Sequence, residues 1–265
     1  MKIACMQVPP VGPQTTPALE RLNGFAREAA GQGCDMLITP EMYLTGYNIG
    51  AEDVARLAEP ADGAMAKAVA GIAQDHGIAI VFGFPERDGT GGAIYNAAQL
   101  VDATGRALLT YRKTHLFGAV DATQFAAGAQ RSPVVRLNGW NVALAICYDV
   151  EFPELTRALA RDGADLVLVP TANMAPYVSV PRRLVPARAE ENGIFLAYAN
   201  YIGSEGAFSY CGLSCICDPA GADLARAGED EVLIVADLDL ARIGEVRQGV
   251  DYLRDRRPGL YGPDA

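Results

Sequence analysis

The sequence predicts an α/β fold in a single domain that spans residues 1–265. Short apolar runs rich in β-formers alternate with amphipathic helical stretches along the whole chain, and antiparallel hairpins are inserted between them. With 265 residues, half of them hydrophobic, the chain can bury one large core. No stretch has the composition of an interdomain linker, which favours one domain over two.

The first half begins with a strand at residues 2–8, and the spacing of Leu19, Leu22 and Phe25 predicts a helix over 17–30. The segment GCDMLITPE then predicts a short buried strand over 36–39, because Pro40 cannot continue a central strand. The other elements expected here are helices over 53–58 and 64–76 and strands over 78–87, 93–102 and 107–113.

The second half opens with a hairpin, for which Asn138-Gly139 is a strong turn signal. A helix is expected to start at Pro153 and to stop at Gly163. The segment GADLVLVP then repeats the pattern of GCDMLITP, which suggests two related βα halves. Further on we expect a charged helix over 181–193, strands over 194–200, 210–217 and 232–237, and an irregular tail.

Composition restricts the partners. The formal net charge is −10 and Lys and Arg are not clustered, so nucleic acid and anionic membrane surfaces are not expected partners. No apolar run reaches ~18 residues, and the first residues read as a strand rather than a leader, so we expect a cytoplasmic protein without a membrane span. The six cysteines are scattered and are expected to be reduced thiols.

The stretch VALAICYDVEFPE ends a buried strand at Cys147 and leads into the helix that starts at Pro153. At such an elbow the unpaired N–H groups of the turn and the positive end of the helix favour a thiolate and a developing oxyanion. The position therefore suits a nucleophile. The alternative is a core cysteine at a strand end, which is common for free cysteines.

Glu41 and Lys113 also stand at the ends of expected strands. An acid, an ammonium and a thiol at one sheet edge form a coherent acyl-transfer site. Glu41 would take the thiol proton, and Lys113 with the N–H of Tyr148 would stabilise the oxyanion of a thioester-forming step. The alternative is a simple ion pair between Glu41 and Lys113 at a loop rim.

A Cys–His arrangement is the competing hypothesis. His76 lies on a polar helix face and is expected to be a solvated surface residue. His115 lies in a loop without an evident acid partner and is expected to be hydrogen-bonded to backbone. Cys211, Cys215 and Cys217 alternate as on a core strand, and two histidines leave a metal short of ligands, so no metal site is expected. Nucleotide-binding and serine-hydrolase motifs are absent from the sequence, and no cofactor is expected.

The segments PEMYLTGYNIG, YRKTHLFG, ICYDVEFPE, VPTANMAPY and RAEENGIFLAYANY resemble the nitrilase, or carbon–nitrogen hydrolase, superfamily over nearly the whole chain. The resemblance implies a four-layer αββα sandwich and a Glu–Lys–Cys triad carried by Glu41, Lys113 and Cys147. It also implies at least a homodimer, with residues 155–161 and 182–192 in the self-complementary surface.

Within the superfamily, the chain is similar in its short length and in the segments TGYNIG, KTHLFG and PTANM to aliphatic amidases of the 5-aminopentanamidase (δ-aminovaleramidase) type. One departure is notable. Many members carry a second Glu before an F-x-P-G turn, whereas this chain has Asp121 before FAAG. The shorter carboxylate changes the reach toward Lys113 or a substrate amine.

The resulting hypothesis is a cofactor-free amidase that hydrolyses a small aliphatic primary amide, with an amino-amide such as 5-aminopentanamide as one candidate, to acid and ammonia. An N-carbamoyl amine or amino-acid hydrolase and a nitrilase are the alternatives of the same class. A catalytically silent member that binds a metabolite is the alternative of another class. The expected pocket residues are Tyr47, Asp121, Tyr148, Glu151, Asn173 and Met174.

Overall fold

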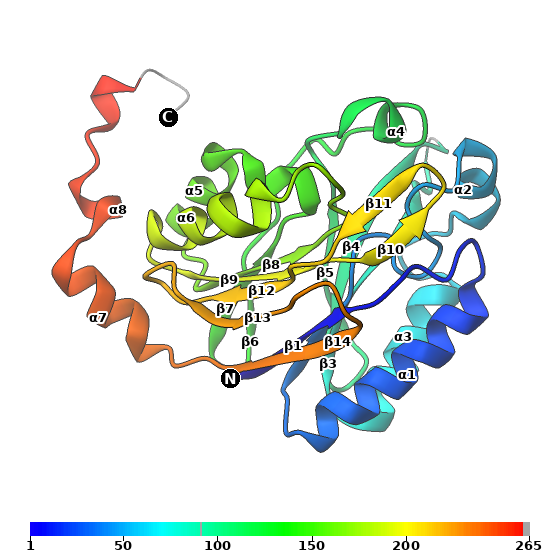
Figure 1. Ribbon diagram of the computed structural model, residues 1–265, viewed down its shortest axis with the longest axis horizontal. Coiled ribbons are helices and arrows are strands. Elements are labelled where there is room, and N and C mark those ends of the chain that lie inside the picture. The colour runs from blue at the N-terminus through cyan, green and yellow to red at the C-terminus, as the bar shows by residue number, and fades with distance from the viewer. Residues whose placement is uncertain (91, 262–265) are drawn as a thin grey trace.

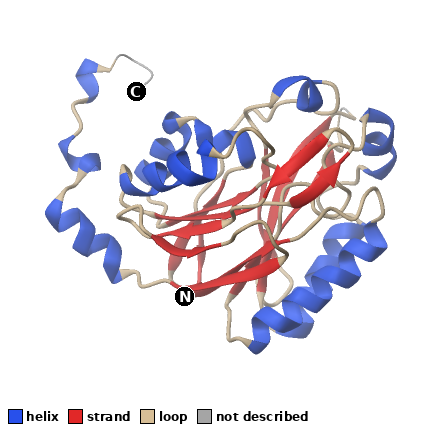
Figure 2. Ribbon diagram, viewed as in Figure 1, coloured by secondary structure: helices blue, strands red, loops and turns tan. Residues whose placement is uncertain are grey.

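Two six-stranded sheets pack face to face, and helices cover both outer faces (Figures 1 and 2). The computed structural model describes residues 1–90 and 92–261. This is the four-layer αββα arrangement expected from the sequence. Among the described helices, none is long and apolar enough to cross a membrane.

The first sheet has a parallel centre with antiparallel strands on both sides. Strand β2 lies parallel between β1 and β3, while β14 pairs antiparallel with β1 and β4 pairs antiparallel with β3. In spatial order its strands are β14 (Val232–Asp237), β1 (Lys2–Gln7), β2 (Met36–Ile38), β3 (Ala79–Arg87), β4 (Ile94–Val101) and β5 (Ala107–Arg112).

The second sheet repeats this plan, with β8 parallel between β7 and β9 and antiparallel strands beyond them. In spatial order its strands are β13 (Asp223–Arg226), β12 (Cys215–Cys217), β9 (Phe195–Ala199), β8 (Leu166–Pro170), β7 (Trp140–Leu144) and β6 (Val135–Leu137). The repeated small-Asp-apolar pattern thus marks β2 and β8, the two central parallel strands, which fits the suggestion of related halves.

Alternating strand residues divide the core into three layers. Residues such as Ile38 and Leu168 point between the sheets. On the outer faces, α1 (Thr15–Gly31) and α3 (Ala64–His76) cover the first sheet, and α5 (Pro153–Arg161) and α6 (Val185–Glu190) cover the second (Figure 1). The helices bury their apolar faces on the sheets, so the loops at the strand ends are left to carry function.

Strand β3 runs through Gly83 and Pro85 to Arg87, in agreement with the strand expected over 78–87. Other local expectations were wrong. The helix expected over 181–193 is a π-helical turn, Val180–Leu184, followed by the short α6. The strand expected over 210–217 is interrupted, because Gly212 and Leu213 have positive φ, and its first part pairs in a separate hairpin of β10 (Ile202–Glu205) and β11 (Phe208–Cys211).

The loop that follows β5 contains a short helix, α4 (Gly118–Ala122). The helix expected over 53–58 is α2 (Ala51–Leu57), which starts two residues earlier than expected. The tail after β14 is helical in part, with α7 (Ala241–Gly249) and α8 (Tyr252–Asp255) extending away from the sandwich (Figure 1). The expectation of an irregular tail, which rested on its Arg, Gly and Pro content, was therefore also wrong.

Candidate active site

Three strand ends bring the acid, the ammonium and the thiol to one region. Glu41 follows β2 after Pro40, Lys113 follows β5 directly, and Cys147 is the third residue after β7. Gly83 in β3 makes the close approach possible, because a Cβ atom there would collide with the backbone N of Met42, next to Glu41. A side chain at Gly83 would push the Glu41 loop away from the sheet.

Lys113 lies between two carboxylates. Its Nζ donates to Oε1 of Glu41 and to Oδ2 of Asp121, both at 2.7 Å. Asn96 Nδ2 also donates to Oε1 of Glu41, at 2.7 Å, and the N–H of Phe117 donates to Oδ2 of Asp121, at 2.8 Å. All three charged side chains are fully buried, so these contacts hold them in fixed positions.

The carboxylates of Glu41 and Asp121 each have one buried oxygen that does not contact Lys113. Glu41 Oε2 and Asp121 Oδ1 have no hydrogen-bond partner among the residues that the structure describes. A buried carboxylate oxygen without a partner is costly unless another molecule completes it. Glu41 Oε2 is therefore free to accept a proton, while Oε1 is occupied by Lys113 and Asn96.

Cys147 opens a 3₁₀ turn, Cys147–Glu151, with a left-handed backbone at φ 48°. Such a conformation is strained for a non-glycine residue and is frequent at active sites. Asp149 fixes the turn, because its carboxylate accepts the N–H of Ile146 at 3.0 Å and the hydroxyl of Tyr111 at 2.9 Å. The N–H of Tyr148 lies in the first turn, where helix N–H groups lack intrahelical partners.

The charges set the resting proton positions. Burial raises the pKa of the Cys147 thiol and the Glu41 carboxylate raises it further, against the opposing effect of Lys113. Burial alone would lower the pKa of Lys113, but the carboxylates, above all Glu41, raise it well above its usual range. Burial and Glu41 thus favour the thiol form of Cys147, while Lys113 acts in the opposite direction, as the helix end was expected to do.

Comparison with known proteins decides the family. Residues 2–248 match the family described as carbon-nitrogen hydrolase. The chain belongs to the carbon–nitrogen hydrolase family. The superfamily, the α/β sandwich and an enzyme that hydrolyses carbon–nitrogen bonds, all expected from the sequence, are confirmed.

The relatives of this carbon–nitrogen hydrolase include a Pseudomonas protegens protein called "Hydrolase in pqqF 5'region", 51% identical over 98% of this chain and 90% of that protein. An (R)-stereoselective amidase of a Pseudomonas species is 38% identical over 99% of this chain and 93% of its own. The crystal structure of an amidase from Nesterenkonia sp. has a TM-score of 0.85 at 39% identity, covering 98% of this chain and 95% of that one. Other structures of that amidase contain acrylamide added at the active-site cysteine, or butyramide.

In this carbon–nitrogen hydrolase, Tyr47 lies beside the ion cluster. Its ring is fully buried with its centroid 5.5 Å from Lys113 Nζ, and its hydroxyl has no hydrogen-bond partner among the described residues. Tyr148 packs edge-to-face on Phe117 and Phe152 and is half-buried. Both tyrosines thus border the region around Lys113 and Cys147.

Of the other expected pocket residues, Glu151 has a carboxylate without a hydrogen bond among the described residues, whereas Asn173 and Met174 are held by contacts of the loop after β8. The carboxylate of Glu151 has no hydrogen bond within the described chain; burial raises its pKa, against the opposing charge of Lys113. Asn173 is engaged in its own loop, because its Nδ2 donates to the carbonyl of Tyr177 at 3.1 Å. Met174 is buried and pairs with Tyr210 of β11 in an isolated β-bridge.

His115 has an acid partner that the sequence did not reveal. Its Nδ1 lies 2.8 Å from Oδ1 of Asp149, its backbone N–H donates to the same oxygen, and its ring stacks on Phe152 at 3.9 Å. The expectation that no acid lies near was wrong. The pairing ties the loop after β5 to the elbow, and the structure records no bond from His115 to Cys147.

The two sulfur atoms of Cys215 and Cys217 and a carboxylate oxygen of Asp223 lie within 4.8 Å of one another. Such a group could bind a metal ion, and it was not expected from the sequence. Two thiols and one carboxylate are few ligands for a closed zinc site. In addition, Arg226 holds both oxygens of Asp223 at 2.6 Å. This cluster is therefore occupied by an ion pair within the chain.

Sequence reasoning missed Asn96 and Asp149, which orient Glu41 and the elbow. Asn96 sits inside β4, where nothing in the alternating pattern distinguishes it from a surface polar residue. Asp149 could have been noticed, since an acid three residues after Ile146 can accept its N–H as in a capping box.

Lys113→Arg is expected to lower turnover by ~10²-fold or more, as deletion of an oxyanion donor does. The planar guanidinium is bulkier than the ammonium, and the cluster has no exposed space for it. Amide turnover at saturating substrate, with circular dichroism as the control for folding, measures the effect. A near-normal rate would remove Lys113 from the reaction.

Proposed function

We propose that this chain acts as a single-domain amidase, which converts a small aliphatic primary amide to the acid and ammonia through a thioester on Cys147. The observation that carries the proposal is the buried cluster of Glu41, Lys113 and Asp121, with Glu41 Oε2 unpartnered among the described residues and close enough to Cys147 for its charge to raise the pKa of the thiol. A general base, a cation and a nucleophile are the groups that amide cleavage requires.

In the proposed reaction Glu41 Oε2 takes the Cys147 proton while Sγ bonds to the amide carbonyl carbon. The Lys113 ammonium and the Tyr148 N–H stabilise the oxyanion. The C–N bond then breaks, and the leaving nitrogen receives the proton from Glu41 and departs as ammonia. Water, deprotonated by Glu41, attacks the thioester, releases the acid and restores the thiol. Asp121 holds the Lys113 ammonium in place throughout.

We propose an aliphatic amide that carries an amine, of the 5-aminopentanamide kind, as the substrate class. The acids outnumber the cations around the site, since Glu41, Asp121 and Glu151 face only Lys113 and Arg188, and the Arg188 guanidinium is shared with Glu191 at 3.2 Å. A protonated amine would offset the half-buried charge of Glu151. The amidases among the relatives support the amide part of this proposal.

Ammonia release from a matched panel tests the proposal. The panel holds butyramide, 5-aminopentanamide, its neutral hexanamide isostere, an N-carbamoyl amine and an aliphatic nitrile. Hydrolysis of the amides, with 5-aminopentanamide favoured over hexanamide by kcat/KM, is the expected result. Preference for the carbamoyl compound or the nitrile would establish one of those hydrolases instead, and a silent panel would revive a metabolite-binding role.

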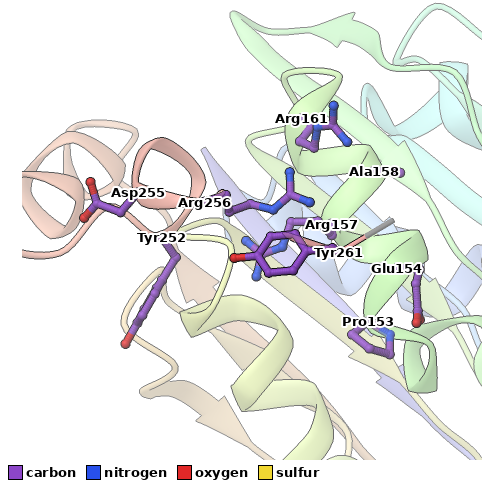
Figure 3. A pocket seen from close by; sticks show the side chains of 9 residues that line it. All are labelled: Pro153, Glu154, Arg157, Ala158, Arg161, Tyr252, Asp255, Arg256 and Tyr261. Carbon is purple, nitrogen blue, oxygen red and sulfur yellow. The ribbon is translucent and has the colours of Figure 1, made fainter. Parts of the chain in front are cut away.

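We also propose that the enzyme is a homodimer or higher oligomer, with α5 and the 182–192 segment in the contact. The C-terminal segment supports this surface, because it leaves Tyr252, Leu260 and Tyr261 48%, 65% and 54% exposed. Beside α5 it borders a groove of about 610 Å³, into which Arg157 and Tyr261 point (Figure 3). Exposed apolar side chains beside a groove are typical of an interaction surface.

The assembly prediction is tested by light scattering at micromolar concentration, where at least twice the chain mass is expected. Arg161→Glu, which reverses a charge on α5 beside the groove, is expected to shift the mass toward the monomer. Arg27→Glu, at an exposed position of α1 on the outer face of the other sheet, is the matched control. A monomer mass for the unmodified protein would contradict the proposal.

A reducing, cytoplasmic location is proposed from the thiols. All six cysteines are free, including the buried pair Cys215 and Cys217. Retained free thiols are typical of proteins from reducing compartments.

A further inference from the structure

The β10–β11 hairpin connects two loops that border the active site. On one side the N–H of Cys211 donates to the carbonyl of Asn173 at 3.1 Å, which holds the loop after β8. On the other side Glu205, at the end of β10, contacts the loop after β2, which carries Tyr47. Figure 1 shows this hairpin as a separate element that reaches from the second sheet toward α2 and α4.

Glu205 uses its carboxylate as a multiple acceptor. Its Oε2 accepts the N–H of Tyr47 at 3.1 Å, the N–H of Asn48 at 2.6 Å and the hydroxyl of Tyr210 at 2.7 Å. In return Asn48 Nδ2 donates to the Glu205 carbonyl at 3.1 Å. Gly46 is required beside it, because a Cβ there would collide with Glu205 Oε1. Among the described residues no cation lies within salt-bridge distance of Glu205. Its carboxylate is therefore balanced by hydrogen bonds, chiefly from the backbone N–H groups of Tyr47 and Asn48.

Tyr47 is the side chain that this anchor places. Glu205 binds its N–H, and Gln124 Nε2 reaches its carbonyl at 3.4 Å, so the backbone is held from both sides. The side chain is then fully buried against Lys113, with a hydroxyl that no described residue completes. A buried hydroxyl without a partner is costly, and a bound ligand would remove that cost.

We propose that Glu205 is a positioning residue that acts through Tyr47, holding the Tyr47 hydroxyl so that it donates a hydrogen bond to the bound amide. This inference rests on the proposed amidase function. The hydroxyl is the substrate contact, and Glu205 sets where that contact lies without touching the substrate. Burial raises the pKa of Tyr47 well above its usual range, so the hydroxyl retains its proton to donate.

A double-mutant cycle on butyramide hydrolysis distinguishes this role from general stabilisation of the hairpin. Tyr47→Phe removes only the hydroxyl, and about a tenfold loss of kcat/KM is expected, which is the effect of one hydrogen bond. Glu205→Ala is expected to cost a similar factor, and the double variant no more than the larger single loss. Glu205→Gln retains an acceptor oxygen for both N–H groups and is expected to recover most of the activity.

Ser209→Ala, on an exposed position of β11, is the control and is expected to match the unmodified enzyme. Thermal unfolding checks each variant, and Glu205→Gln still tests the proposal if Glu205→Ala fails to fold. Losses that multiply in the double variant, or a Tyr47→Phe enzyme with unchanged kcat/KM, would overturn the positioning role. Failure of the unmodified enzyme to hydrolyse any amide would instead contradict the proposed function itself.

Discussion

Cys147→Ala is expected to abolish amide hydrolysis and to leave the fold intact. The substitution removes the nucleophile, so no thioester can form. Asp149 retains its bonds to Ile146 and Tyr111, so the elbow keeps its geometry. Ammonia release measures activity, and circular dichroism with thermal unfolding measures the fold.

Cys34→Ala is the matched control for Cys147→Ala. Cys34 is a free, buried thiol that lies between α1 and β2, away from the catalytic cluster. Activity close to that of the unmodified enzyme is expected for it. Full activity in Cys147→Ala would end the thioester mechanism.

Glu41→Gln is expected to lower the rate of acylation by ~10²–10⁴-fold, the usual contribution of a general base. The amide matches the carboxylate in size and can still accept a hydrogen bond from Lys113 through its oxygen, but it cannot take the Cys147 proton. Single-turnover kinetics are needed, because slow product release would mask a chemical defect in the steady state.

His115→Asn is the matched comparison for Glu41→Gln. His115 bonds Asp149 and stacks on Phe152, so its loss affects the loop and not the proton transfer. Most of the acylation rate is expected to remain, with some loss of thermal stability. The two substitutions therefore separate a Glu base from a His base.

The parts of the fold that depend on neighbouring residues in the sequence could be predicted. The alternating runs located the central strands, and Pro40, Gly163 and Asn138-Gly139 marked ends and turns through their own backbone preferences. Strand ends indicated that Glu41, Lys113 and Cys147 could meet, because ligands gather at the carboxyl ends of strands. The expectation of one sheet edge was wrong, since β2 and β5 belong to the first sheet and β7, which precedes Cys147, belongs to the second.

Long-range contacts were not predictable from one sequence. The bond from Asn96 to Glu41 joins residues 55 apart, and the bond from Glu205 to Asn48 joins residues 157 apart. Neither pair leaves a periodic signal. The break between β11 and β12 was missed for a related reason, since the positive φ of Leu213 depends on packing around it rather than on its own preference.

The mass of the intact protein after a rapid quench tests most directly whether Glu41 activates Cys147 for attack on an unactivated amide. With butyramide as substrate, we expect an acyl adduct on Cys147 that forms at nearly the normal rate in His115→Asn and at least ~10²-fold more slowly in Glu41→Gln. No adduct is expected in Cys147→Ala. Acylation that persisted at full rate in Glu41→Gln and disappeared in His115→Asn would contradict the account and assign the base to histidine.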